Sequence, residues 1–250
     1  LHYRDRRQRQ MCIRDSISTA YEQELVSLRD KTLEMAGIVE SHYTKAIDAL
    51  NMQDTKAAEE ISKNDYIVNK MEIEIDEACH TLIATQSPVA SDLRKILVIL
   101  KINNDLERVG DEAEKIARNT LEMDLNKIQK NFLNSLYHLG VESKKSINKA
   151  IDAYARQSVD SAMDVIRTDK YIDDEFESCM RQLMSFMMQD PKAIKNILDI
   201  TNIAKGIERV GDHAVNIAQH TIQLVIGKDI RHTSSEQVLE EIRNNTSYKY

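Results

Sequence analysis

Two stretches of this chain nearly repeat one another and decide its fold: LERVGDEAEKIARNT at residues 106–120 and IERVGDHAVNIAQHT at residues 207–221. Nine of the fifteen positions are identical, at a fixed offset of 101 residues. Chance does not produce such agreement, so the chain contains two copies of one unit of roughly 100 residues. In both stretches the apolar residues recur at alternating steps of three and four. That is the periodicity of a helix with one buried face.

The rest of the sequence also predicts long, uninterrupted helices. Its 250 residues include only two prolines and six glycines, the residues that helix interiors tolerate least. Ser87-Pro88 ends one helix, Ser91 is the expected N-cap of the next, Asp190-Pro191 starts another and Gly227 closes the last. The expected helices cover residues of about 17–50, 54–86, 91–123, 127–156, 158–189 and 192–227. The predicted fold is therefore all-α, with two tandem, similar three-helix bundles built from six long helices.

The domain boundaries follow from the repeat. The first unit is expected at 17–124, the second at 125–235 and a C-terminal tail at 236–250. Residues 1–16 contain five arginines and no apolar period. They are expected to be a disordered or extraneous extension outside the fold.

Composition narrows the class of function. A net charge of −7 argues against general nucleic-acid binding. No apolar run approaches the 18 residues of a membrane span, so no membrane insertion is expected. Three widely spaced cysteines and the lack of a secretory signal predict a cytoplasmic protein with reduced thiols. No nucleophile motif is present, so no enzyme is expected. The sequence contains neither a Gly-rich loop nor an arginine cluster, so direct phosphate binding is not predicted.

Acidic residues provide the candidate site. Glu107 and Asp111 lie four residues apart, as do Glu208 and Asp212, and both pairs point away from the apolar seam. The preceding helices carry polar stripes at similar spacing: Asp65, Asn69, Glu72 and Asp76 in the second, and Asp169, Asp173 and Glu177 in the fifth. Neighbouring carboxylates repel, and a hard cation such as iron, manganese, magnesium or calcium relieves that repulsion. The competing interpretation is a solvated acidic surface paired with Lys or Arg.

Other residues leave alternatives open. Gly110 and Gly211 lie inside helices, which indicates a close approach by a neighbouring helix or by a ligand. His213 is expected to be a surface or dimer-contact residue, close enough to support a second metal cluster, and His80 and His220 to be helix-surface residues. A di-iron enzyme would need Glu-x-x-His pairs that project inward, and this chain has none in the repeated stretches.

The repeated stretches, together with residues 70–118 and the closing GKDIRH at residues 227–232, resemble the PhoU family. The resemblance runs from about residue 17 to residue 235. It implies two three-helix bundles with surface metal clusters, iron first and manganese, zinc or magnesium as alternatives. It implies a homodimeric negative regulator of the phosphate-starvation response and of phosphate uptake. The implied partners are the ATPase subunit of the phosphate ABC transporter and a sensor histidine kinase. Phe176 stands where the second helix has Glu72, so the two clusters are not expected to be equivalent.

Overall fold

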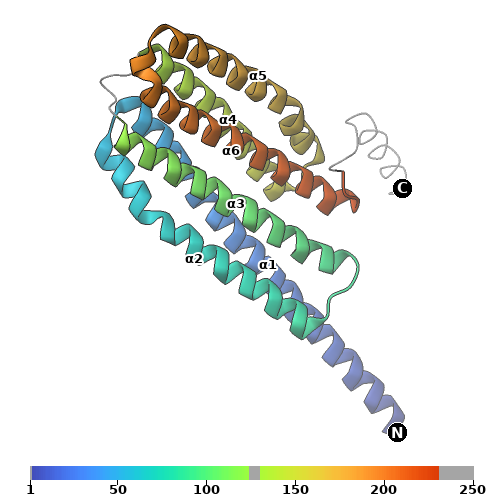
Figure 1. The fold of residues 1–250 in the computed structure, drawn as a ribbon. Helices are drawn as coiled ribbons and strands as arrows, with labels where there is room; N and C mark the ends of the chain where they lie inside the picture. The colour runs from blue at the N-terminus through green and yellow to red at the C-terminus, as the bar shows by residue number, and fades with distance from the viewer. Residues whose placement is uncertain (1, 124–129, 231–250) are drawn as a thin grey trace.

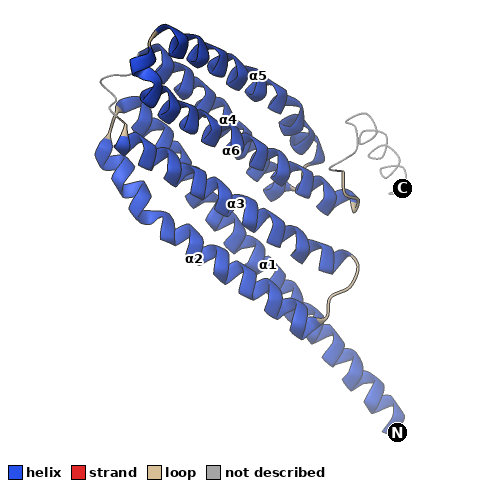
Figure 2. Ribbon diagram, in the orientation of Figure 1, coloured by secondary structure: helices blue, strands red, loops and turns tan. Residues whose placement is uncertain are grey.

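The structure is a computed structural model that describes residues 2–123 and 130–230, with side chains from Tyr21 onward except Pro191. Within these ranges it contains helices and no strand (Figure 2). The elements are α1 (His2–Met52), α2 (Thr55–Gln86), α3 (Ser91–Glu122), α4 (Lys130–Arg156), α5 (Val159–Gln189), η2 (Pro191–Ala193) and α6 (Ile194–Ile226). The predicted all-α class with six long helices is confirmed.

The helices form two bundles that pack side by side. α1, α2 and α3 pack on one another, and so do α4, α5 and α6. α3 packs along α6 and α1 along α4, which joins the two bundles (Figure 1). α3 and α6, the helices that carry the repeated stretches, therefore lie in the middle of the molecule.

Several helices begin or end at the residues that the sequence predicts, and for the predicted reason. α2 stops at Gln86, immediately before Ser87-Pro88. At its start, the Asp54 carboxylate accepts hydrogen bonds from the backbone N–H groups of Lys56 at 3.0 Å and Ala57 at 3.1 Å. Gly227 closes α6 at φ 87°, and its N–H donates to the Gln223 carbonyl at 2.9 Å. A left-handed residue is the ordinary way to satisfy the last carbonyls of a helix.

Two predicted caps differ in the structure. Ala90, not Ser91, occupies the N-cap of α3, and no side chain caps it. The Asp190 carboxylate does accept from the Lys192 N–H at 3.0 Å, but the residues that follow form the 3₁₀ turn η2. The Ala193 N–H bonds three residues back to the Asp190 carbonyl at 3.0 Å, which makes this turn tighter than an α-turn. α6 consequently begins at Ile194.

The N-terminal segment also differs from its prediction. Residues 2–16 are helical and extend α1 past the end of its bundle (Figure 1), whereas the sequence predicts disorder. The segment contains no Pro or Gly, and extending a helix that is already docked costs far less than nucleating one. That it is extraneous stays a prediction. The expected unit boundary at 124/125, the helix start at 127 and the boundary at 235/236 with its tail lie outside the described residues.

The predicted apolar seams form the core. On α3, Ile102, Leu106 and Val109 are buried, and on α6 Ile203 and Ile207 are buried. Leu224, the last residue of the predicted seam, is only partly buried. Within the described ranges, no helix combines the length and the hydropathy that crossing a bilayer requires.

Candidate functional site

The first acidic cluster forms where α3 packs against α2. A Cβ on Gly110 would lie only 3.1 Å from Val68 Cγ1, so the missing side chain lets the two helices approach closely. The alternative left open for this glycine is settled in favour of a neighbouring helix. Glu107 thereby comes near Glu72 and Asp65. Burial raises the pKa of Glu107 above its ordinary value, and the charges of Asp111, Glu72 and Asp65 raise it further.

The remaining members of the α2 stripe lie along the same contact. Asn69 Nδ2 donates to Asp65 Oδ2 at 2.8 Å. Asn103, from α3, donates to the Glu72 carbonyl at 3.0 Å and to Asp76 Oδ1 at 3.4 Å. The predicted adjacency between the α2 stripe and the α3 pair is therefore present in the first bundle.

The second acidic cluster forms between α5 and α6. Burial raises the pKa of Asp169 to about 6, and the charges of Asp173, Asp212 and Glu208 contribute to the rise. The pKa values of Glu208 and Asp212 are also raised, through burial first and then through neighbouring carboxylates that include Asp173. Glu177 does not join them.

Two residues of α5 lie outside the second cluster. Glu177 is exposed and bonds to Arg181 at 3.2 Å. Phe176 packs against the hydrophobic core at the position where α2 carries Glu72. The α5 carboxylates near the α6 pair are therefore Asp169 and Asp173, as many as α2 brings near Glu107.

The donor chemistry of the first cluster fits a hard cation. Its ligand atoms are carboxylate and amide oxygens, and Asn69 Oδ1 is buried without a hydrogen-bond donor. Among the side chains that the structure describes, no three His, Cys, Asp or Glu residues already converge on one ion position. Coordination would therefore require the carboxylates to change rotamer. Asp111 has a competing partner in Lys115, whose ammonium lies 3.7 Å from its carboxylate.

Between the bundles lies a buried polar network that the sequence did not predict. Asp105 of α3 is 5 % exposed and contacts three side chains of α6. His213 Nδ1 lies 2.9 Å and Asn216 Nδ2 3.2 Å from Asp105 Oδ1, and His220 Nε2 lies 3.4 Å from Oδ2. His220 is buried, which corrects its prediction as a helix-surface residue. His213 is partly buried and contacts Asp105 of the other bundle, and a dimer contact or a role in the second metal cluster stays a prediction.

Glu112, seven residues after Asp105 on α3, is a second buried acid that contacts α6. The carboxylate of Glu112 bonds to Lys115 at 3.1 Å and to Arg209 at 3.3 Å. A Cβ on Gly206 would lie 3.1 Å from Glu112 Oε2. Later residues of α3 contact earlier residues of α6, so the two helices run antiparallel.

The two contacts are counterparts under the internal repeat. At the repeat offset of 101 residues, Asp105 corresponds to Gly206 and His213 corresponds to Glu112. The sequence carried a signal for this network. Asp105 and Glu112 are seven residues apart on the stripe that also holds Ile102, and an acid at such a position must find a partner inside the protein.

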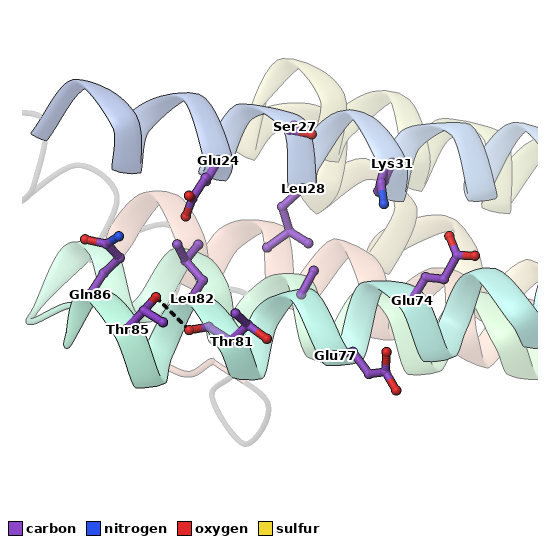
Figure 3. A pocket seen from close by; sticks show the side chains of 11 residues that line it. Glu24, Ser27, Leu28, Lys31, Glu74, Glu77, Thr81, Leu82, Thr85 and Gln86 are labelled. Carbon is purple, nitrogen blue, oxygen red and sulfur yellow. Dashed lines mark hydrogen bonds between the residues drawn. The ribbon is translucent and has the colours of Figure 1, made fainter. Parts of the chain in front are cut away.

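A pocket of about 640 Å³ lies elsewhere, between α1 and α2 (Figure 3). Leu28 from α1 and Leu82 from α2 face one another across it, and Glu24, Lys31 and Glu74 lie around them. None of the predicted metal ligands lines this pocket, so it is separate from both acidic clusters.

Comparison with known proteins places both repeats in one family. The family model described as PhoU domain matches residues 32–120 and 136–221. A Pseudomonas aeruginosa protein, the phosphate-specific transport system accessory protein PhoU homolog, is 39% identical over 229 residues, which cover 92% of this chain and 95% of the relative. The Escherichia coli K12 phosphate-specific transport system accessory protein PhoU is 40% identical over 222 residues, 89% of this chain and 92% of the relative.

Solved structures agree in fold. The crystal structure of PhoU from Pseudomonas aeruginosa superposes with a TM-score of 0.80 at 38% identity, covering 83% of this chain and 100% of that one. The phosphate transport system regulatory protein PhoU from Streptococcus pneumoniae superposes with a TM-score of 0.77 at 26% identity, covering 84% of this chain and 98% of that one. The likeness therefore extends over both bundles.

Proposed function

Because this chain belongs to the PhoU family over both of its repeats, we propose that it is an accessory protein of a phosphate-specific transport system. In that role it restrains the phosphate-starvation response and phosphate uptake. The observation that carries the proposal is the extent of the match, which covers nine-tenths of this chain and of relatives that bear this name. Those relatives are named as accessory or regulatory proteins rather than enzymes.

The mechanism we propose is that of an adaptor. The protein works in the cytoplasm as a homodimer and contacts the ATPase subunit of the phosphate ABC transporter and a sensor histidine kinase. Long helices joined through the buried Asp105 network offer such partners a surface of fixed shape. Restraint follows if one adaptor holds the transporter and the kinase in their phosphate-replete states.

Metal ions are the proposed cofactors of this surface. Glu107 and Asp111, with the α2 stripe, would hold one cluster, and Glu208 and Asp212, with Asp169 and Asp173, the other. Support comes from the raised pKa of Glu107 and of Asp169, because carboxylates that repel one another gain most from a cation. The unsatisfied Asn69 oxygen adds a neutral ligand to the first cluster only. Iron is the first candidate, with manganese, zinc and magnesium as alternatives.

Regulation is tested by deleting the gene. We expect phosphate-scavenging genes to be expressed at high phosphate in the deletion strain, and a plasmid copy of the wild-type gene to restore repression. Unchanged expression after deletion would contradict the regulatory role.

Metal binding is tested by elemental analysis of the gently purified protein. The wild type is compared with a variant that replaces Glu107, Asp111, Glu208 and Asp212 by alanine. A matched control replaces four acids outside the clusters whose side chains are about half exposed, Glu59, Glu74, Asp152 and Asp164. We expect stoichiometric metal in the wild type and the control, and none in the cluster variant.

The same measurement separates the two alternative functions. A structural scaffold without functional metal would contain no stoichiometric metal in any of the three proteins. A carboxylate-bridged di-metal enzyme would contain metal and also react with oxygen or peroxide. The partly exposed position of Glu107 and Glu208 on the bundle surface favours the regulator over that enzyme.

A further inference from the structure

A concave site of about 430 Å³ lies on the seam between the two bundles, where α3 packs along α6. Figure 1 shows these two helices side by side in the middle of the molecule. The residues that line the site are all ionisable: Arg108, Asp111, Glu112, Lys115, Arg209 and His213. A cavity with this lining is suited to a small, highly charged ligand rather than to an apolar one.

The internal repeat explains why two arginines meet here. Arg108 and Arg209 occupy the same position of the repeated Glu-Arg-Val-Gly-Asp sequence, 101 residues apart. Because α3 and α6 pack antiparallel, the two equivalent side chains line one site, one from each helix. The sequence shows no arginine cluster, since only the packing of the bundles brings the pair together.

Among the side chains that line the site, permanent cations outnumber carboxylates. Glu112 holds Lys115 at 3.1 Å and Arg209 at 3.3 Å, and Asp111 lies 3.7 Å from Lys115. Arg108 has no hydrogen-bond or ion-pair partner within 4.0 Å among the described residues, although it lies near enough to Glu107 to lower that residue's pKa. Three permanent cations and two carboxylates thus line the site, and Arg209 also lies near enough to Glu208 and Asp212, outside the lining, to lower their pKa values.

We propose that this site binds a phosphoryl oxyanion held by Arg108 and Arg209, one from each helix, with Lys115 as a third donor. The planar guanidinium fork matches phosphate oxygens and can donate two parallel hydrogen bonds. The anion is either inorganic phosphate or the phosphate group of a small metabolite. The inference rests on the proposed function, to which it adds a direct contact between the regulator and the phosphate signal. An anion held in this way touches both bundles and strengthens their association.

The first test measures binding of inorganic phosphate to the full chain by calorimetry. We expect saturable binding of one phosphate per chain, weakened about tenfold or more by Arg108→Gln and by Arg209→Gln. Arg118→Gln is the matched control, because Arg118 is an exposed arginine of the same helix that pairs with Glu114 outside the site. It should leave binding unchanged. Arg108→Gln removes no hydrogen bond or ion pair among the described residues, so circular dichroism should show that this variant is folded.

A second variant moves affinity in the opposite direction. Glu112→Gln removes the carboxylate that competes for Arg209 and Lys115, so it should tighten phosphate binding. A merely structural ion-pair network does not predict this gain. Repeating the titrations with ADP identifies the source of the anion. If ADP binds and inorganic phosphate does not, with the same pattern among the variants, the ligand is a phosphorylated metabolite.

The inference is overturned if neither probe binds at concentrations up to about 10 mM. It is equally overturned if Arg118→Gln weakens binding as much as Arg108→Gln does. These failures leave the proposed function standing, because that function is judged by gene expression in the deletion strain. Conversely, phosphate binding in a protein whose deletion changes no expression would support the site and remove the regulatory role.

Discussion

Two aspartates of this chain have pKa values shifted in opposite directions. Burial alone would raise the pKa of Asp105, but the hydrogen bonds from His213 and His220 outweigh it and the pKa is lowered. Asp169 is surrounded by other carboxylates, and its pKa rises to about 6. The residue type is the same, so the partners across the helix interface decide the chemistry.

The raised pKa of Asp169 has a consequence for stability. The folded protein binds this proton more tightly than the unfolded chain, whose aspartates titrate near about 4. The stabilisation is fully present below that pH and is lost as the pH rises through about 6. Asp169→Asn should therefore increase the free energy of unfolding at pH 7, by about 1 kcal/mol after allowance for solvent screening at this partly exposed site.

Urea denaturation of the metal-free protein at pH 4 and pH 7 checks this expectation. The gain should appear at pH 7 and vanish at pH 4. Asp174→Asn, an exposed position on the same helix, is the control and should change little at either pH. A loss of stability at pH 7 in the Asp169 variant would contradict the argument.

At the scale of the helices, glycines set how closely neighbours approach. Gly110 and Gly211 occupy equivalent positions of the two repeats, and each faces a β-branched residue of the preceding helix. A Cβ on Gly211 would lie 3.5 Å from Ile172 Cγ2, an ordinary contact, whereas one on Gly110 would lie 3.1 Å from Val68 Cγ1. The first bundle is therefore the tighter one at this point.

These distances predict different outcomes for one substitution. Gly211→Ala should raise the free energy of unfolding by about 0.5–1 kcal/mol, because alanine favours the helix and the space is available. Gly110→Ala should gain less or lose stability, since Val68 is stiff and must shift. Thermal denaturation of both variants beside the wild type measures the difference. Equal stabilisation by both substitutions would show that the close approach at Gly110 has no energetic effect.

Gly140 of α4 is a stricter case, at the contact between α4 and α1. A Cβ there would lie 2.7 Å from Ile47 Cδ1 and 2.9 Å from Cγ2. Both atoms belong to a β-branched side chain that is itself buried. Gly140→Ala should lower the free energy of unfolding by about 1–3 kcal/mol through overpacking. Ile47→Val in the same background relieves part of the crowding, and the double variant should recover part of the loss.

At the scale of the whole molecule, buried polar contacts join the bundles. Asp105 accepts from α6 side chains, and Glu112 holds Arg209. Removing the Asp105 carboxylate leaves the largely buried His213 and His220 side chains without their acceptor, which costs more than the contact itself contributed. The association of the bundles is therefore sensitive to single substitutions on α3.

Asp105→Ala should lower the free energy of unfolding by about 2–4 kcal/mol, because His213, Asn216 and His220 lose their shared acceptor. Hydrogen exchange should quicken in α3 and α6 before it quickens in α2 and α5. Asp105→Asn keeps one acceptor and should cost less. Wild-type exchange rates in α3 and α6 of the alanine variant would show that the bundles are held by apolar packing alone.

The sequence by itself determined the repeat, the all-α class and, apart from the start of α1, the described helix ends to within a few residues. Ser87-Pro88 and Gly227 terminate helices through their own backbone preferences, and the period of Ile102, Leu106 and Val109 marks a buried stripe. Such features depend on residues within a few turns of one another, so they can be recognised without the fold. The carboxylate pairs Glu107/Asp111 and Glu208/Asp212 can likewise be recognised from their spacing within one helix.

Only the tertiary structure decided what those residues face. Whether Gly110 admits a helix or a ligand depends on the packing of α2, and the environment of His220 depends on the other bundle. Arg108 and Arg209 meet because two units about 100 residues apart pack with α3 and α6 antiparallel. That arrangement is set by the shapes of two complete surfaces, and no spacing along a single helix encodes it.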